Sequence, residues 1–310
     1  MDISSSSRPT VSSSGSFLRF MRRHPLVCYF LMAYGFSWLG WLPYVLSQSG
    51  LGLLPFHFSE LVGLPGGYGP LLSGVLMTAV IGGKAEVRHL LHRLVLWRVG
   101  WQWYLFALIG VPAILVLGFL LLPGAMAALR VPSSQFVLVF LLLLVFEILT
   151  SGLSEEPGWR GFALPRLQQQ QGPLLGTLIL GLLWGGWHLP LFLTTWAIVG
   201  ANGLSICEFV LGAMSLAIIF TWVFNHTRGS LLVAILFHAS IDAFASAAVI
   251  TGLLPMQILL KGAYLPTLIG FGGLALLLIV VTRGRLGYQQ ARPLSDTEPA
   301  LDDGQRLVIN

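Results

Sequence analysis

Long apolar runs recur along nearly the whole chain and are separated by short polar stretches. A transmembrane helix needs about 20 predominantly apolar residues, and eight runs reach roughly that length. None alternates in the manner of a membrane β-barrel strand, so the backbone groups of each run must be paired within a helix. The pattern predicts an all-α, polytopic transmembrane helical bundle with about eight spans. These cover residues 25–47, 66–83, 101–122, 134–154, 173–196, 204–224, 231–251 and 264–282.

Both ends of the chain and one loop depart from this pattern. Residues 1–24 are Ser-rich and then basic, which is typical of a disordered tail, and residues 283–310 lack periodicity, which predicts a flexible tail. Residues 84–100 place Leu and Val among Arg and His and predict an amphipathic interfacial helix, or simply an anchor for the second loop. A single transmembrane domain is therefore expected at 25–282.

Composition and charge support a membrane location. Hydrophobic residues make up 55% of the chain and charged residues 9%, against roughly 25% charged residues in soluble domains. The net charge of +5 does not indicate nucleic-acid binding, because the basic residues form no stripe with interleaved aromatics. Of the 17 Lys and Arg residues, all except Arg130 and Lys261 fall on one side of an eight-span topology. This bias predicts cytoplasmic termini and an integral protein of the plasma (inner) membrane, with the lipid bilayer as a partner.

Ionisable side chains inside the spans mark the candidate chemistry. Each costs at least ~2.5–3.5 kcal/mol at membrane depth, so each is a functional candidate. They are concentrated in one part of the chain, about 145–245, which argues against the matched halves of an inverted-repeat transporter. They are Glu147, Glu155, Glu156, His188, Glu208, His238 and Asp242, with Arg160 close behind.

The first motif is the run from Ser154 to Arg160. On a helix, Glu156 and Arg160 are four residues apart and can form an ion pair. Glu155 then faces another direction, and a free carboxylate in a partly dehydrated site suits a general base that activates water. The alternative is that both glutamates merely begin an interfacial helix, near the positive end of its dipole.

Two histidine motifs follow in later spans. Trp184 and His188 share one helix face, and Pro190 weakens the helix just beyond them. His238 and Asp242 also lie four residues apart and can point at a shared cavity. The alternative for either histidine is an ordinary interhelical hydrogen bond.

These residue types are sufficient for hydrolysis by two routes. A carboxylate and an imidazole can activate water while other donors stabilise an oxyanion. Alternatively, Glu155, His188 and His238 could bind Zn²⁺ and lower the pKa of its bound water to about 7. The His-Glu-x-x-His zinc signature is absent from the sequence, and the sequence leaves both routes open.

The predicted spans create a problem of depth. With Glu155 at the end of the fourth span, His188 lies about 24 Å into the fifth and His238 about 11 Å into the seventh, at 1.5 Å per residue. For these residues to meet, we expect residues 155–172 to re-enter the membrane, or the fifth helix to begin deeper. The Gly and Pro residues of this segment permit such a break.

Taken together, the three motifs resemble those of the CPBP (CAAX protease and bacteriocin-processing, or Abi) membrane peptidases, which include the Ras-converting CAAX endopeptidase. The resemblance covers about 145–245. It rests on Glu155-Glu156-x-x-x-Arg160, on an aromatic residue four before His188, and on His238-x-x-x-Asp242.

The resemblance implies an intramembrane endopeptidase that acts on a membrane-associated or prenylated-like peptide or protein without a metal cofactor. It implies that Glu155 and His188 activate water, that His238 and Asp242 stabilise the oxyanion, and that Glu156 and Arg160 are a supporting pair. Where this chain has Asp242 the family often has Asn, and an anionic Asp is a poor oxyanion donor. The alternative is that Asp242 orients His238.

Two other functions fit the same residues. A proton-coupled transporter would use the ionisable side chains to carry protons, and Glu147 and Glu208, which have no role in the peptidase hypothesis, favour it most. A non-catalytic peptide-binding or immunity protein would keep the fold and tolerate replacement of Glu155.

Overall fold

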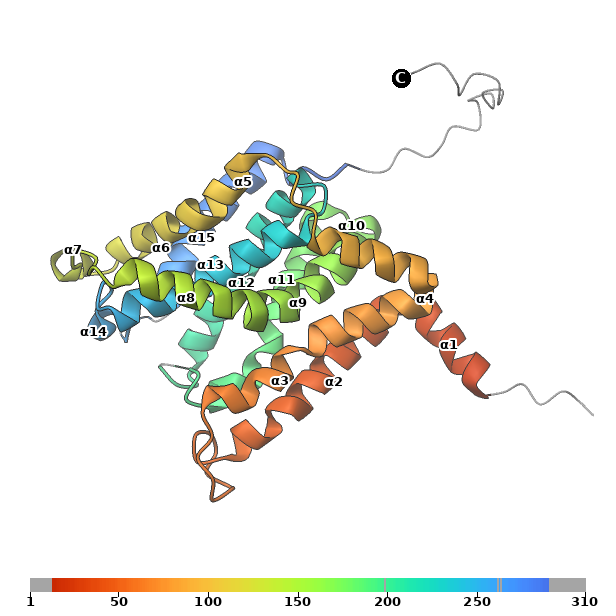
Figure 1. The fold of residues 1–310 in the computed structure, drawn as a ribbon, viewed down its shortest axis with the longest axis horizontal. Coiled ribbons are helices and arrows are strands. Elements are labelled where there is room, and N and C mark those ends of the chain that lie inside the picture. Colours follow the sequence, from red (N-terminus) through yellow and green to blue (C-terminus); the bar gives the residue numbers. More distant parts are fainter. Residues whose placement is uncertain (1–12, 198, 261, 263, 290–310) are drawn as a thin grey trace, which may run out of the picture.

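The computed structural model describes residues 13–289 except 198, 261 and 263, and within these residues the chain is helical with no strand. Eight helices are long and apolar enough to cross a membrane, which confirms the predicted fold class and number of spans (Figure 1). Their bounds are Pro25–Leu46, Leu61–Leu94, Trp101–Leu120, Phe136–Gln171, Pro173–Leu193, Gly203–His226, Leu231–Ile250 and Leu265–Thr282.

The fourth span is the main departure from the sequence prediction. It does not end at residue 154 but continues as one helical stretch of 36 residues from Phe136 to Gln171. Five segments follow one another without a break, and in two of them the helix widens to π geometry. They are α8 (Phe136–Glu147), the π turn η3 (Ile148–Gly152), α9 (Leu153–Gly158), the π turn η4 (Trp159–Ala163) and α10 (Leu164–Gln171).

This continuity removes the problem of depth without a re-entrant segment. Glu155 precedes Gln171 by 16 residues, about 24 Å at 1.5 Å per residue, and therefore lies near the middle of the 36-residue helical stretch. The seventh span begins deeper than the fourth ends, because Leu231 packs beside Gly161. Neither the predicted break nor the predicted end of the fourth span is present.

Smaller differences occur at the two tails and the second loop. Ser13–Arg23 form helix α1 within the tail that was predicted to be disordered, while residues 1–12 and 290–310 lie outside the described residues. The predicted interfacial helix is not separate. Residues 84–94 continue helix α4 (Gly69–Leu94) beyond a bend at Gly83, where φ is 65°, and residues 95–100 are not helical.

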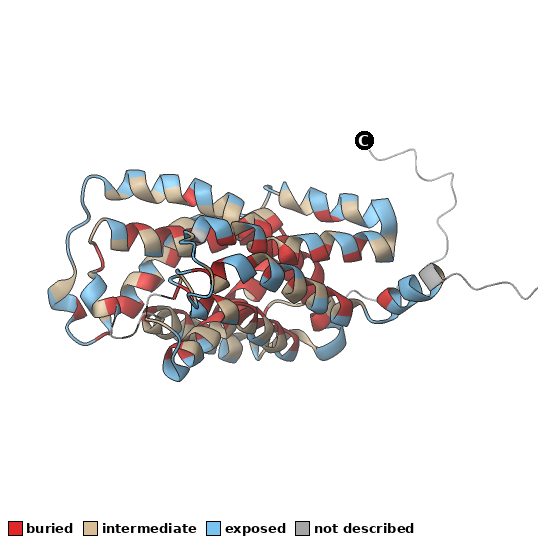
Figure 2. Cartoon of the chain, turned by 90° about the horizontal axis from the view of Figure 1, so that it is seen from below, coloured by how far each residue is buried: buried red, intermediate tan, exposed pale blue. Residues whose placement is uncertain are grey.

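Helix α13 (Leu231–Ile250) is the most enclosed span and packs against α8, α9, α6 (Val111–Leu120) and α12 (Gly203–His226). On the other side of α9, helix α4 packs against it and pairs with α2 (Pro25–Leu46). Helix α11 (Pro173–Trp187) pairs with α12, and α15 (Leu265–Thr282) packs against both α12 and α6. Buried positions accordingly follow the inner faces of the helices (Figure 2). The centre of the fourth span thus lies between two groups of helices.

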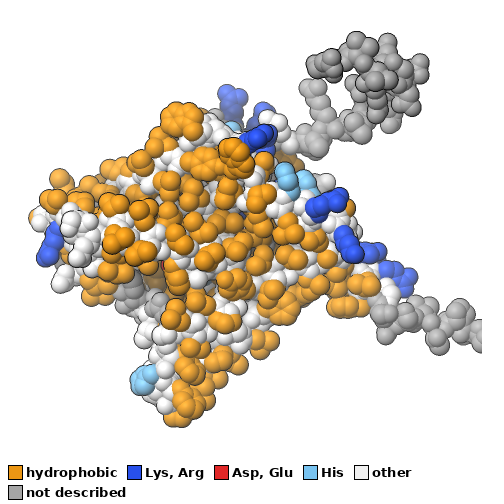
Figure 3. Space-filling view, viewed as in Figure 1, with side chains coloured by type: hydrophobic (Ala, Val, Ile, Leu, Met, Phe, Trp, Pro, Cys, Tyr) orange, Lys and Arg blue, Asp and Glu red, His pale blue; other side chains and the backbone are white. Residues whose placement is uncertain are grey.

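The exterior is that of a protein solvated by lipid. Large apolar side chains cover the visible face, while basic side chains gather mainly along one margin (Figure 3). Exposed hydrophobic residues occur on every span, for example Leu31, Leu142 and Val280. In water such a surface would be far larger than the apolar patches of soluble monomers, so the fold requires a bilayer.

Candidate active site

Helix α9 carries both candidate glutamates between the two π turns. A π turn inserts one extra residue into a helix and often occurs at functional sites. Pro157 has no N–H to give to the preceding turn, yet the helix continues because its neighbours pack closely around it. A Cβ at Gly158 would overlap the Pro70 carbonyl of α4, and a Cβ at Gly152, the last residue of η3, would lie 2.9 Å from the Ile235 carbonyl of α13. These close approaches hold α9 against α4 and α13.

Carbonyl groups in and beside the π turns are paired by side chains. The Tyr68 hydroxyl donates to the Leu149 carbonyl (2.9 Å), and the Ser154 hydroxyl donates to that of Ser151 (3.1 Å). The Arg93 guanidinium donates to Gly161 (3.3 Å) and also to Gly229 (2.9 Å). Because an unpaired carbonyl at membrane depth costs several kcal/mol, these bonds explain how the helix tolerates two wide turns around its glutamates.

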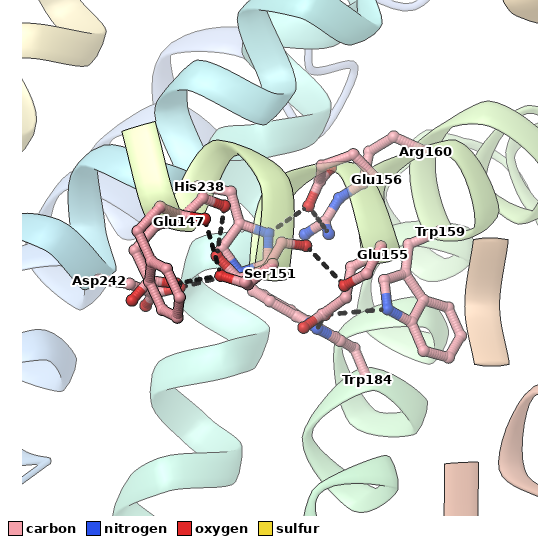
Figure 4. A network of polar contacts seen from close by, with 12 residues as sticks. Glu147, Ser151, Glu155, Glu156, Trp159, Arg160, Trp184, His238 and Asp242 are labelled. Atoms are coloured by element: carbon pink, nitrogen blue, oxygen red, sulfur yellow. Dashed lines mark hydrogen bonds and ion pairs between the residues drawn. The ribbon is translucent and has the colours of Figure 1, made fainter. Parts of the chain in front are cut away.

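Glu155 is held by two indole groups. Its Oε2 accepts hydrogen bonds from Nε1 of Trp184 on α11 (2.6 Å) and from Nε1 of Trp159 on η4 (3.2 Å) (Figure 4). The other oxygen makes no hydrogen bond to a described residue, and it is not among the fully enclosed polar atoms without a partner. Glu155 is 6% exposed, so its second oxygen has the remaining access to water.

Glu156 faces the other way and is completely buried. Its Oε1 accepts from Arg160 Nη1 (2.8 Å) and lies 2.7 Å from His238 Nδ1 (Figure 4). The predicted pairing with Arg160 is therefore confirmed. The guanidinium carbon of Arg160 lies 4.3 Å from the Trp184 ring centre and 3.9 Å from that of Phe220, so aromatic faces enclose the cation.

His238 lies between two carboxyl groups. Its Nδ1 faces Glu156, and its Nε2 lies 3.5 Å from Oδ2 of Asp242, four residues along α13. The His238 side chain is 7% exposed and that of Asp242 is 38% exposed. The structure therefore brings this predicted pair together and places Asp242 at the more open end of the site.

His188 is adjacent to this cluster but not bonded to its carboxylates. It caps the C-terminus of α11, and its Nδ1 lies 2.9 Å from the Trp184 carbonyl oxygen. Aromatic rings surround it, with centroids of Trp187 at 4.7 Å and Phe209 at 5.0 Å. Among the described residues no hydrogen bond or ion pair joins His188 to Glu155 directly, and Trp184, which bonds both, connects them.

The predicted zinc ligands do not form one donor set. Glu155, His188 and His238 each face other partners, as described above. Among residues 13–289, with the three gaps, no group of three or more His, Cys, Asp or Glu side chains is arranged to hold a metal ion. The residues present therefore do not fit the zinc site that the sequence left open.

Several residues of the site were not assigned roles from the sequence. Trp159 had no role, and Trp184 was noted only as an aromatic residue, although both indoles donate to Glu155. The spacing could have revealed Trp159, since it lies four residues after Glu155. Ser151 lies beside the carboxyl groups of Glu147 and Asp242 (Figure 4).

The two remaining intramembrane glutamates differ in position. Glu147 accepts a hydrogen bond from Thr150 at 3.1 Å, within its own helical stretch, and borders the site near Asp242 (Figure 4). Glu208 is on α12 and is 9% exposed, with no hydrogen bond to the described residues. Among the described residues, neither side chain forms a hydrogen bond to another helix.

Comparison with known proteins agrees with these motifs. Residues 135–244 match the family described as type II CAAX prenyl endopeptidase Rce1-like. Over 114 residues the chain is 32% identical to a protein named CAAX prenyl protease 2 from Methanococcus maripaludis, which covers 36% of this chain and 40% of that protein. The match thus spans about two fifths of the length of this curated relative. The segment that carries the site is thus similar to the CAAX-protease family, in agreement with the resemblance drawn from the sequence.

Proposed function

We propose that this protein is an intramembrane endopeptidase that hydrolyses a peptide bond of a membrane-associated, prenylated-like peptide or protein. The observation that carries the proposal is the asymmetric environment of Glu155, with one oxygen held by two indole N–H groups and the other open. A general base must be fixed in position while keeping one lone pair for the water that it deprotonates. The match of residues 135–244 to the Rce1-like family supports the same reaction class.

In this proposal each polar residue has a separate task. Glu155 takes a proton from the attacking water, and His188, whose Nε2 makes no hydrogen bond to a described residue, binds or orients that water. His238 donates from Nε2 to the developing oxyanion, which requires a substrate oxygen to replace Asp242 as its neighbour. Glu156 and Arg160 hold His238 in place. No metal ion is required for these steps.

Asp242 orients His238 in this scheme rather than binding the oxyanion. Its oxygen lies 3.5 Å from His238 Nε2, and a carboxylate beside an imidazole nitrogen favours a proton on that nitrogen, as Glu156 does at Nδ1. Because the Asp242 side chain is 38% exposed, it can give way to a substrate carbonyl.

We also propose the orientation that the basic residues favour, with both termini on the cytoplasmic side of the plasma (inner) membrane. The ends of α4, α10, α12 and α15 then lie on the cytoplasmic side. A substrate peptide tethered to the bilayer would reach the site from the membrane plane, without leaving its anchor.

Cleavage by the purified full chain in lipid nanodiscs tests this function. A library of fluorogenic peptides bearing C-terminal isoprenyl groups is compared with the same peptides lacking them, for the natural chain and for Glu155→Ala and His188→Ala. We expect the cleavage rate to fall at least ~100-fold in either variant, because loss of a general base typically costs a factor of ~10²–10⁴. Undiminished cleavage in both variants would refute the assigned roles.

A strong chelator in the same assay separates the two hydrolytic routes. We expect no loss of activity after chelation and no gain when Zn²⁺ is returned. Activity that disappears with the chelator and recovers with zinc would support the metal route. Uptake driven by a pH gradient, with no cleavage of any peptide, would instead support the transporter hypothesis.

A further inference from the structure

A cavity of about 840 Å³ lies on the basic margin of the protein, and none of the candidate catalytic residues lines it. It is formed where α10, α12 and α15 end and where the turn before α13 begins. Among the residues that line it are Gln168, His226, Arg228, Arg285 and Tyr288. No Asp or Glu is among the described residues of its wall, so the cavity is cationic.

Arg228 has a left-handed backbone conformation, and a backbone carbonyl of another residue holds its side chain. It follows the C-terminal end of α12 with φ of 55°, a left-handed conformation in which helices usually place glycine. Its guanidinium donates to the Arg98 carbonyl. A left-handed conformation costs an arginine roughly 1–2 kcal/mol that glycine would avoid, which points to a use for the side chain at this position.

Gln168 provides a second and independent indication of a ligand. It is 3% exposed, and its Nε2 is fully enclosed with no hydrogen-bond partner among the described residues. A buried amide that lacks a partner loses about 1–3 kcal/mol. The same side chain lines the cationic cavity, and a rotation of its amide would bring the N–H₂ group to an acceptor bound there.

The neighbouring surface indicates what carries that acceptor. The last turns of α15, which end at the cavity, expose Leu277, Val280 and Val281 to the extent of 57%, 74% and 71%. An anion that binds in the cavity therefore lies at the end of a helix whose last turns expose apolar side chains, a surface of the kind that contacts acyl chains. Basic pockets between transmembrane helices on the cytoplasmic side bind anionic headgroups.

We propose that this cavity binds the phosphate headgroup of an anionic phospholipid. Arg228 and Arg285 bind the phosphate oxygens, the Gln168 amide donates a further hydrogen bond, and the acyl chains lie along α15. The proposal is independent of the proposed peptidase activity. A soluble phosphate or an acidic peptide would use the same cations but would gain nothing from the apolar face.

The proposal is tested by measuring lipid binding to the full chain in detergent. The protein is titrated with phosphatidylglycerol and, separately, with phosphatidylcholine. Retained lipid is counted by native mass spectrometry, and the thermal midpoint is followed in parallel. We expect phosphatidylglycerol to be retained and to stabilise the chain more than phosphatidylcholine. In Arg228→Gln/Arg285→Gln the preference should fall roughly 30-fold, about fivefold for each basic residue at the surface.

Lys84→Gln/Arg88→Gln is the matched control. It removes the same charge from exposed positions on the same membrane side, outside the cavity, and should keep the preference for phosphatidylglycerol. Gln168→Met, which removes only the amide, should weaken that preference and does not depend on the turn that contains Arg228. It therefore tests the proposal even if the double variant fails to fold.

Three outcomes would overturn the proposal. One is an unchanged preference for phosphatidylglycerol in both cavity variants, and another is an equal loss in the control variant. The third is stabilisation by inorganic phosphate, or by an acidic peptide, as large as that by phosphatidylglycerol, which would assign the cavity to a soluble anion.

Discussion

Two consecutive glutamates on α9 occupy opposite environments. Glu155 accepts hydrogen bonds from two neutral indole groups and keeps one oxygen open, whereas Glu156 lies between the cations or potential cations Arg160 and His238. Successive residues on a helix point about 100° apart, so one turn reaches both the α11 side and the α13 side. The comparison shows how one helical turn can separate a reactive carboxylate from a structural one.

The energetics of the two sides differ accordingly. A buried ion pair gains stability only when both charges are present, because each is costly to bury alone. A carboxylate held by indoles has no counter-ion whose loss would leave a charge unpaired. We therefore expect changes at Glu155 to affect mainly the cleavage rate and changes at Glu156 to affect mainly the stability of the fold.

Exchange of each glutamate for glutamine should separate the two roles most clearly. Glu155→Gln should lower the cleavage rate by ~10²–10⁴-fold, since the amide cannot accept the proton, while the free energy of unfolding changes by less than about 1 kcal/mol. Glu156→Gln should lower the free energy of unfolding by about 3–5 kcal/mol. Cleavage kinetics measure the change in rate, and reversible unfolding in mixed micelles measures the change in the free energy of unfolding. Equal effects at both positions would remove the contrast.

A compensating change should then reverse part of the loss at Glu156. Arg160→Met added to Glu156→Gln removes the unpaired cation and leaves a thioether between the rings of Trp184 and Phe220. The double variant should be more stable than Glu156→Gln alone, with a coupling energy of about 0.5–3 kcal/mol from a double-mutant cycle. Additive effects of the two substitutions would show that the ion pair with Arg160 does not account for the contribution of Glu156 to stability.

The two indoles should contribute unequally to the Glu155 side. Trp184→Phe removes a donor at 2.6 Å and Trp159→Phe removes one at 3.2 Å. A hydrogen bond to a charged group contributes about 1.5–3 kcal/mol, and the shorter bond should account for the larger loss of cleavage rate. If Trp159→Phe has the greater effect, Trp184 is not the main group that positions the carboxylate.

The smallest effect is expected at Tyr29, whose ring packs edge-on against Trp159. Its hydroxyl is fully enclosed without a partner among the described residues, as are Glu156 Oε2 and two nitrogens of Arg160. Tyr29→Phe removes a buried polar atom that makes no protein hydrogen bond, so the free energy of unfolding should change by less than about 1 kcal/mol. A loss above 2 kcal/mol would reveal a hydrogen-bonded network through this phenol, with ordered water as the connection.

Local spacing made much of the site predictable. The pairs Glu156 with Arg160 and His238 with Asp242 follow from four-residue separations on helices, and the structure contains both contacts. The bond from Trp159 to Glu155 has the same separation but was not predicted. The contacts of His238 with Glu156 and of Trp184 with Glu155 join residues that are 82 and 29 positions apart, and no local pattern specifies them.

Hydropathy alone determined the fold class and the eight spans, because a bilayer allows only helices with internally paired backbones in such apolar runs. The end of the fourth span depended on tertiary structure. Its Gly and Pro residues predict a break when considered in isolation, but α4 and α13 pack against the glycines, and Tyr68 and Arg93 pair carbonyls of the π turns. The sequence determined which side chains are available for chemistry. Helix packing decided which glutamate remains open to water, because only the neighbouring helices supply the indoles on one side and the imidazole on the other.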